Sequence, residues 1–155
     1  MRKNSRYIII GIIAVIIFFS LKTFNDYRER SLDDLINFKK VDFYSLGFIK
    51  DIEMVPDNRA YEWMTEEKEP VVELMEFLSQ YRVKKVSEDT FNEKINGEVG
   101  FELTINYSKA NPAIVWVDEN RVHILVGNYY EVVNGPIDIE WIKEYNNKYR
   151  EKYAE

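Results

Sequence analysis

The chain carries an uninterrupted apolar segment, Tyr7–Leu21 (YIIIGIIAVIIFFSL), that contains no charged side chain. A helix made of these residues is apolar on all sides, which is typical of a membrane span and argues against a helix lying on a soluble core. The 15 residues extend roughly 22 Å, and the flanking residues 4–6 and 22–24 bring the helix close to the roughly 30 Å hydrocarbon thickness of a bilayer. We therefore predict a membrane anchor over residues 1–24.

A cleaved secretory signal is the alternative interpretation of the same segment. Positive charge followed by an apolar run is the pattern of a signal peptide as well as of an anchor. A signal peptidase requires small residues at its cleavage site, whereas residues 18–22 read Phe-Phe-Ser-Leu-Lys. We therefore expect the segment to remain in the protein, and cleavage stays the alternative.

Basic residues are distributed unevenly around the apolar segment. Arg2, Lys3 and Arg6 precede it with no acidic residue among them, whereas the basic residues that follow it alternate with Asp26 and Glu29. Positive residues beside a span favour the cytoplasmic side of the membrane. The distribution predicts a single-pass protein of the cell membrane, with a cytoplasmic N-terminus and an extracytoplasmic C-terminal domain.

The remainder of the chain is acidic and free of cysteine. Three of the 21 basic residues and none of the 27 acidic residues lie before residue 22, so residues 22–155 carry a net charge of −9. Such a charge repels phosphate backbones and other polyanions, so we expect no nucleic-acid partner. The absence of cysteine excludes disulfides, thiolate metal sites and cysteine nucleophiles. The domain must be stabilised by core burial alone, for which its length is sufficient.

Two later segments have the periodicity of amphipathic helices. In residues 66–81, Val71, Leu74, Met75 and Leu78 fall on one helical face. Asp138 is a suitable N-cap for a second helix that ends at Tyr153. The apolar stripe of this second helix consists of Trp141, Ile142, Tyr145 and Tyr149. A shorter helix is expected after Ser31, because Asp33 and Asp34 place acidic side chains in its first turn.

The rest of the sequence alternates apolar and polar residues, most clearly in Val99–Tyr107. The expected strands cover residues 41–46, 48–55, 60–64, 83–86, 99–107, 114–117, 122–126 and 129–133, with turns at 56–58 and 118–121. This order predicts an α+β fold in which an antiparallel sheet carries two helices on one face. We divide the chain into the anchor, a juxtamembrane connector over 25–37 and an extracytoplasmic domain over 38–155.

No sequence motif identifies a catalytic, cofactor-binding or metal site. His123 is the one histidine and lies within a predicted strand, and phosphate-binding loops and nucleophile elbows are absent. Pairs or groups of carboxylates occur at Asp51/Glu53, Glu66/Glu67/Glu69, Glu88/Asp89 and Asp118/Glu119. These pairs lie in predicted turns and helix starts, where a solvated acidic surface is ordinary. We therefore assign no catalytic residue, no metal ligand and no cofactor.

Adjacent tyrosines in the last predicted strand are the candidate partner-binding residues. Tyr129 and Tyr130 must point to opposite faces of the sheet, so one of them is expected at the surface. Exposed tyrosine is enriched at protein interfaces. We predict that Tyr129 or Tyr130 contacts a protein or peptide partner whose identity the sequence does not specify.

Two stretches, VVELMEFLSQYRVKKV (Val71–Val86) and VVNGPIDIEWI (Val132–Ile142), resemble segments of small uncharacterised membrane-anchored ectodomain proteins of Bacillus-type Gram-positive bacteria. The plan of a basic start, an anchor and an acidic α+β body is similar as well. The resemblance implies a location and a style of fold. It implies no activity and no site residues.

These observations favour a non-enzymatic extracytoplasmic binding or interaction domain held by one N-terminal helix, with the bilayer and an unknown protein or peptide as its partners. A secreted inhibitor or immunity-type protein, released by signal cleavage, is one alternative. A membrane-tethered hydrolase that uses a pair of carboxylates is another, because glycoside hydrolysis needs two carboxylates at a suitable separation in a cleft.

Overall fold

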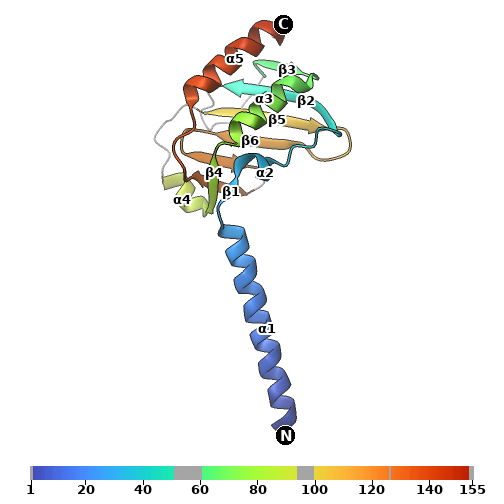
Figure 1. Ribbon diagram of the computed structural model, residues 1–155, viewed down its shortest axis with the longest axis vertical. Coiled ribbons are helices and arrows are strands. Elements are labelled where there is room, and N and C mark those ends of the chain that lie inside the picture. The colour runs from blue at the N-terminus through green and yellow to red at the C-terminus, as the bar shows by residue number, and fades with distance from the viewer. Residues whose placement is uncertain (1, 51–60, 94–99, 126, 154–155) are drawn as a thin grey trace.

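The computed structural model describes residues 2–50, 61–93, 100–125 and 127–153, and within these it describes side chains from Tyr7 onward except that of Lys50. A long helix, α1 (Arg2–Tyr27), projects from a mixed helix and strand body, and the C-terminal helix lies at the end of the body far from α1 (Figure 1). The α+β prediction is confirmed.

The body is built on one antiparallel sheet of eight strands in the order β1-β4-β8-β7-β6-β5-β2-β3. Strands β5 to β8 follow one another along the chain and pair as a meander, as expected for strands joined by short turns. The strands are β1 (Arg30–Ser31), β2 (Phe43–Lys50), β3 (Trp63–Thr65), β4 (Arg82–Val86), β5 (Phe101–Tyr107), β6 (Ala113–Val117), β7 (Arg121–Ile124) and β8 (Asn128–Val132).

The main core lies between one face of this sheet and helices α3 (Lys68–Leu78) and α5 (Ile139–Tyr153). The predicted stripes of both helices are buried there, with Leu74 of α3 and Tyr149 of α5 almost wholly inaccessible to solvent. The two helices are also hydrogen-bonded, because the Tyr145 hydroxyl donates to the Pro70 carbonyl oxygen at 2.8 Å. Asp138 caps α5 as expected, and its Oδ1 accepts a hydrogen bond from the backbone N–H of Trp141 at 3.0 Å.

The opposite face of the sheet carries a smaller apolar cluster under helix α4 (Glu88–Glu93). Phe91 of α4 packs edge-on against Trp116 of β6, with ring centroids 5.9 Å apart. Successive residues of a strand point to opposite faces, so Trp116 lies on the face away from its core neighbours Val115 and Val117. Both faces of the sheet are therefore covered at strands β6 to β8, near its middle.

Residues 30–36 of the expected connector belong to the body. Arg30 and Ser31 form β1 and pair with β4, and the short predicted helix is present as α2 (Leu32–Ile36). Leu32 and Ile36 are buried in the main core. The backbone N–H of Leu32 also donates a hydrogen bond to the carbonyl oxygen of Tyr81, the residue before β4, at 3.0 Å. The folded body therefore begins three residues after α1 ends.

The N-terminal strands differ from the prediction in their bounds. A single strand, β2, replaces the two strands expected from residue 41 onward, and its pairing with β5 shifts register between Phe43 and Ser45. Val41 is fully exposed in the turn that precedes β2. The expected turn at 56–58 and the pair Asp51/Glu53 lie outside the described residues.

Candidate functional site

Helix α1 presents an apolar surface that no part of the described body covers. The 21-residue stretch Tyr7–Tyr27 has none of its residues buried. By length and composition it is sufficient to cross a membrane, since 21 residues of helix extend roughly 30 Å. The interpretation as a buried core helix is therefore not supported by the structure.

The body is attached directly to the end of this stretch. Arg28 and Glu29 alone separate α1 from β1, and β1 pairs with β4 through Arg30↔Val83 and Ser31↔Arg82. In Figure 1 the strands β1 and β4 and the helix α4 are the parts of the body nearest to α1. If α1 crosses a bilayer, this end of the body lies at the surface of the leaflet where the helix emerges.

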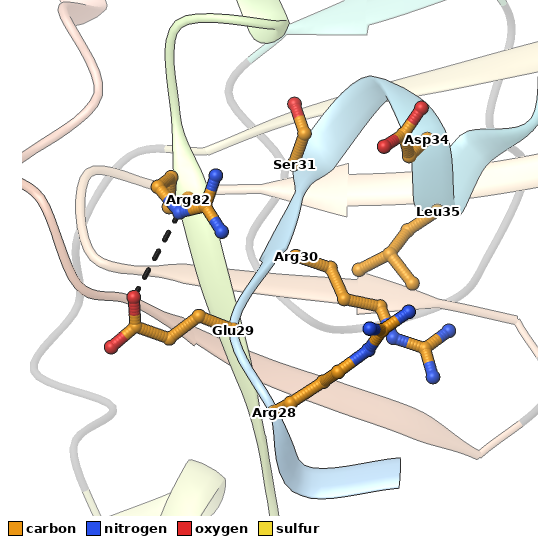
Figure 2. Close-up of a pocket in the computed structure, with 7 residues that line it drawn as sticks. All are labelled: Arg28, Glu29, Arg30, Ser31, Asp34, Leu35 and Arg82. Carbon is orange, nitrogen blue, oxygen red and sulfur yellow. Dashed lines mark ion pairs between the residues drawn. The ribbon is translucent and has the colours of Figure 1, made fainter. Parts of the chain in front are cut away.

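A polar cavity of about 310 Å³ lies at this junction (Figure 2). We call it the arginine pocket, because three arginines from two separate segments line it. Its lining residues are Arg28, Glu29, Arg30, Ser31, Asp34, Leu35 and Arg82. The pocket brings residues next to α1 together with one from β4, far along the chain.

The three arginines differ in what they contact. The guanidinium of Arg30 donates through Nη2 to the Asn25 carbonyl oxygen at 2.7 Å, while its Nε is buried and has no hydrogen-bond partner. Arg82 lies 3.8 Å from Glu29, measured from Nε to Oε2, and both side chains are about half exposed. The side chains of Arg28 and Arg30 extend to the same side of β1, toward Leu35 (Figure 2). The pocket is thus partly neutralised by its own carboxylates.

Tyr129 and Tyr130 pack in different apolar clusters, on opposite faces of the sheet. Tyr130 is buried in the main core, where desolvation raises the pKa of its phenol, the charge of Arg30 lowers it and the charge of Asp26 raises it. These two charges act on Tyr130 because its phenol lies toward the end of α1. Tyr130 is therefore part of the core packing at the end of the body next to α1, and the sequence gives no sign of this.

Tyr129 lies on the other face of the sheet, in the cluster under α4. Its ring stacks on His123 with centroids 4.5 Å apart and contacts Phe91 at 5.0 Å. Its hydroxyl donates to Glu88 Oε1 at 3.0 Å, and this hydrogen bond raises the pKa of Tyr129. Tyr129 is half-buried, so an intramolecular contact occupies part of the surface expected for a partner. Its role in partner binding stays a prediction.

His123 is desolvated by the same cluster. Burial lowers the pKa of its imidazole below the ordinary 6.5, and the charge of Glu88 opposes this in part. Its Nε2 is buried without a hydrogen-bond partner. The folded protein therefore favours the neutral imidazole.

We expect the body to lose stability as the pH falls below about 6.5, because the unfolded chain then binds a proton that folded His123 accepts only at lower pH. This contribution is complete above the unfolded pKa and is lost as the pH falls toward the folded pKa. The check is denaturant unfolding of wild type and His123→Gln at about pH 7.5 and about pH 5.5, an interval above the range in which most carboxyls titrate. The wild type should lose more stability than the variant, and equal losses would contradict the assignment.

At least one carboxylate of each described pair or group makes a contact within the protein. Glu67 accepts hydrogen bonds from Lys152 at 2.9 Å and from Tyr153 at 2.7 Å, and these bonds lower the pKa of its carboxyl. Asp118 is buried in an ion pair with Arg121. Among the described residues no group of three or more His, Cys, Asp or Glu side chains is placed to hold a metal ion.

No protein-family model matches the chain, and no curated protein or solved structure is similar to it at a significant level. The resemblance to membrane-anchored proteins of Bacillus-type bacteria stays a prediction.

Proposed function

We propose that this chain is a single-pass membrane-anchored protein whose α+β body is a non-enzymatic binding or interaction domain. One observation carries the proposal: an exposed apolar helix of membrane-spanning length continues within three residues into the first strand of the body. A long linker would let the body act at a distance from the bilayer. This direct attachment holds the body, and any partner bound to it, at the membrane surface.

The proposed orientation places the N-terminus in the cytoplasm and the body outside the cell membrane. It is supported by the basic residues that precede the span without any acidic neighbour. The net charge of −9 on residues 22–155 favours a protein or peptide partner with positive charge over a polyanion.

Cysteine labelling tests this orientation. The natural chain contains no cysteine, so any label on the protein reports the introduced thiol. Lys109→Cys introduces a thiol in the exposed turn after β5, and Ser5→Cys introduces one before the span. In intact cells a membrane-impermeant maleimide should label the first variant only, since a charged reagent does not cross the bilayer. Labelling of Ser5→Cys in intact cells, with Lys109→Cys protected until the cells are permeabilised, would contradict the orientation.

A further inference from the structure

We propose that the arginine pocket binds the phosphodiester of an anionic phospholipid headgroup, with phosphatidylglycerol as the chemical type. The inference rests on the proposed membrane anchoring and adds a specific lipid site to it. The predicted partner-binding residues Tyr129 and Tyr130 are not among the residues that line this pocket.

The position of the pocket relative to the bilayer follows from its spacing along the chain from the anchor. The anchor expected from the sequence ends at residue 24, and the pocket lining begins at Arg28, four residues further along. Four residues of helix extend roughly 6 Å, so with residues 4–24 in the hydrocarbon core Arg28 and Arg30 fall in the headgroup layer beside it. The pocket therefore meets headgroups without any movement of the body.

The charge of the pocket suits a monoanion. Three guanidinium groups and the two carboxylates of Glu29 and Asp34 line it, so its formal net charge is +1. This positive site lies on a body whose overall charge is strongly negative. A phosphodiester carries one negative charge, which matches this net charge. The two carboxylates would repel a phosphate with more than one negative charge more strongly. The Asp34 carboxylate is exposed and able to accept hydrogen bonds from the hydroxyl groups of a glycerol headgroup.

The hydrogen-bonding capacity of the pocket is incompletely used within the protein. Arg28 makes no hydrogen bond or ion pair to the described residues, and Arg82 is separated from Glu29 by 3.8 Å, beyond ordinary hydrogen-bond length. Guanidinium groups bind phosphate oxygens through paired N–H donors, which gives both energy and geometry. A bound phosphodiester would supply acceptors for these donors, and the cavity of about 310 Å³ leaves room for the remainder of a headgroup.

The test uses the full chain in lipid nanodiscs that contain equal amounts of phosphatidylglycerol and phosphatidylcholine. The lipid that stays with the protein on release is identified by native mass spectrometry. Wild type should retain phosphatidylglycerol in preference to phosphatidylcholine. The double variant Arg28→Gln/Arg30→Gln should lower this preference about tenfold, as expected for the loss of charge-assisted hydrogen bonds.

Two further variants separate a pocket from general attraction to a charged surface. Lys22→Gln removes one positive charge from exposed α1 residues near the same interface but outside the pocket, and it should leave the preference unchanged. Arg28→Gln alone should reduce the preference and leave the unfolding midpoint as in wild type, since the structure gives Arg28 no hydrogen bond or ion pair to the described residues. This single variant keeps the proposal falsifiable if the double variant disturbs the junction at Asn25.

Several outcomes would overturn the proposal. Equal losses in Lys22→Gln and Arg28→Gln would mean that surface charge alone attracts the lipid. Equal retention of phosphatidylcholine would remove the requirement for an anion. Displacement of the lipid by soluble glycerophosphoglycerol at low concentration would identify a site for a free phosphodiester in place of a membrane lipid. Failure of wild type to enter nanodiscs would instead contradict the membrane anchoring, and the two failures are therefore distinguishable.

Discussion

Arg121→Met should destabilise the body by about 3–5 kcal/mol, because it leaves the Asp118 carboxylate buried without its charged partner. The side chains of both residues are almost fully inaccessible to solvent. The Asp118 carboxylate also accepts hydrogen bonds from the backbone N–H groups of Asn120 at 2.8 Å and of Arg121 at 2.7 Å. These bonds hold the carboxylate in place in the variant and prevent it from turning toward water.

The loss of stability should extend beyond the β6–β7 turn to helix α4. The Arg121 guanidinium donates through Nη1 to the Phe91 carbonyl oxygen at 3.2 Å and lies over the rings of Phe91 and Trp116. The ion pair thus joins the turn to the helix that covers the second face of the sheet. Methionine replaces the apolar volume but neither the charge nor the donor.

Denaturant unfolding of the full chain in detergent micelles measures this effect. The matched control is Lys143→Gln, which removes an ion pair to Glu140 at the same sequence spacing of three residues but on an exposed surface. Its cost should stay below about 1 kcal/mol. If Arg121→Met costs no more than this control, the pair does not have the role that its burial implies.

The second large effect is expected in α1, from the double variant Ile13→Arg/Ile17→Arg. Both side chains are exposed along the apolar surface of the helix and lie one turn apart. Two arginines near the centre of a span disfavour insertion by roughly 5–7 kcal/mol on insertion scales. The variant should therefore be lost from the membrane fraction, or degraded, in cells where wild type is retained there.

The control for this variant is Ile13→Leu/Ile17→Leu, which keeps the helix apolar and should fractionate as wild type does. Alkaline carbonate extraction of membranes is the measurement, since it removes peripheral proteins and leaves spanning ones. If the arginine variant remained in the membrane pellet as wild type does, the membrane attachment would have to lie outside α1.

The sequence is sufficient to predict the helices and strands whose apolar residues repeat regularly. Leu74 and Leu78 of α3 identify a helix, and the alternation around Leu103 and Ile105 identifies β5. It was not sufficient for α4, in which Phe91 is the one buried residue among six and leaves no periodic signal. This omission had a consequence for the candidate site, because α4 supplies the contacts that partly cover Tyr129.

The charge of residues 25–37 gives no sign that part of this segment packs in the core. Leu32 and Ile36 are nevertheless buried there. The arginine pocket was not predicted either, since Arg82 joins Arg28 and Arg30 only through the pairing of β1 with β4. Its sequence signal was the group of basic residues after the span, which we used for orientation alone.

The mass and location of the native protein test most directly whether α1 stays in the bilayer and holds the body at its surface. Cells expressing the natural chain are separated into cytosol, carbonate-extracted membranes and medium, and each fraction is examined by intact mass spectrometry. Anchoring by α1 predicts one species of 18.6 kDa, found in the extracted membranes. A species in the medium that lacks the apolar segment, or the full-length chain free of lipid in the cytosol, would contradict it.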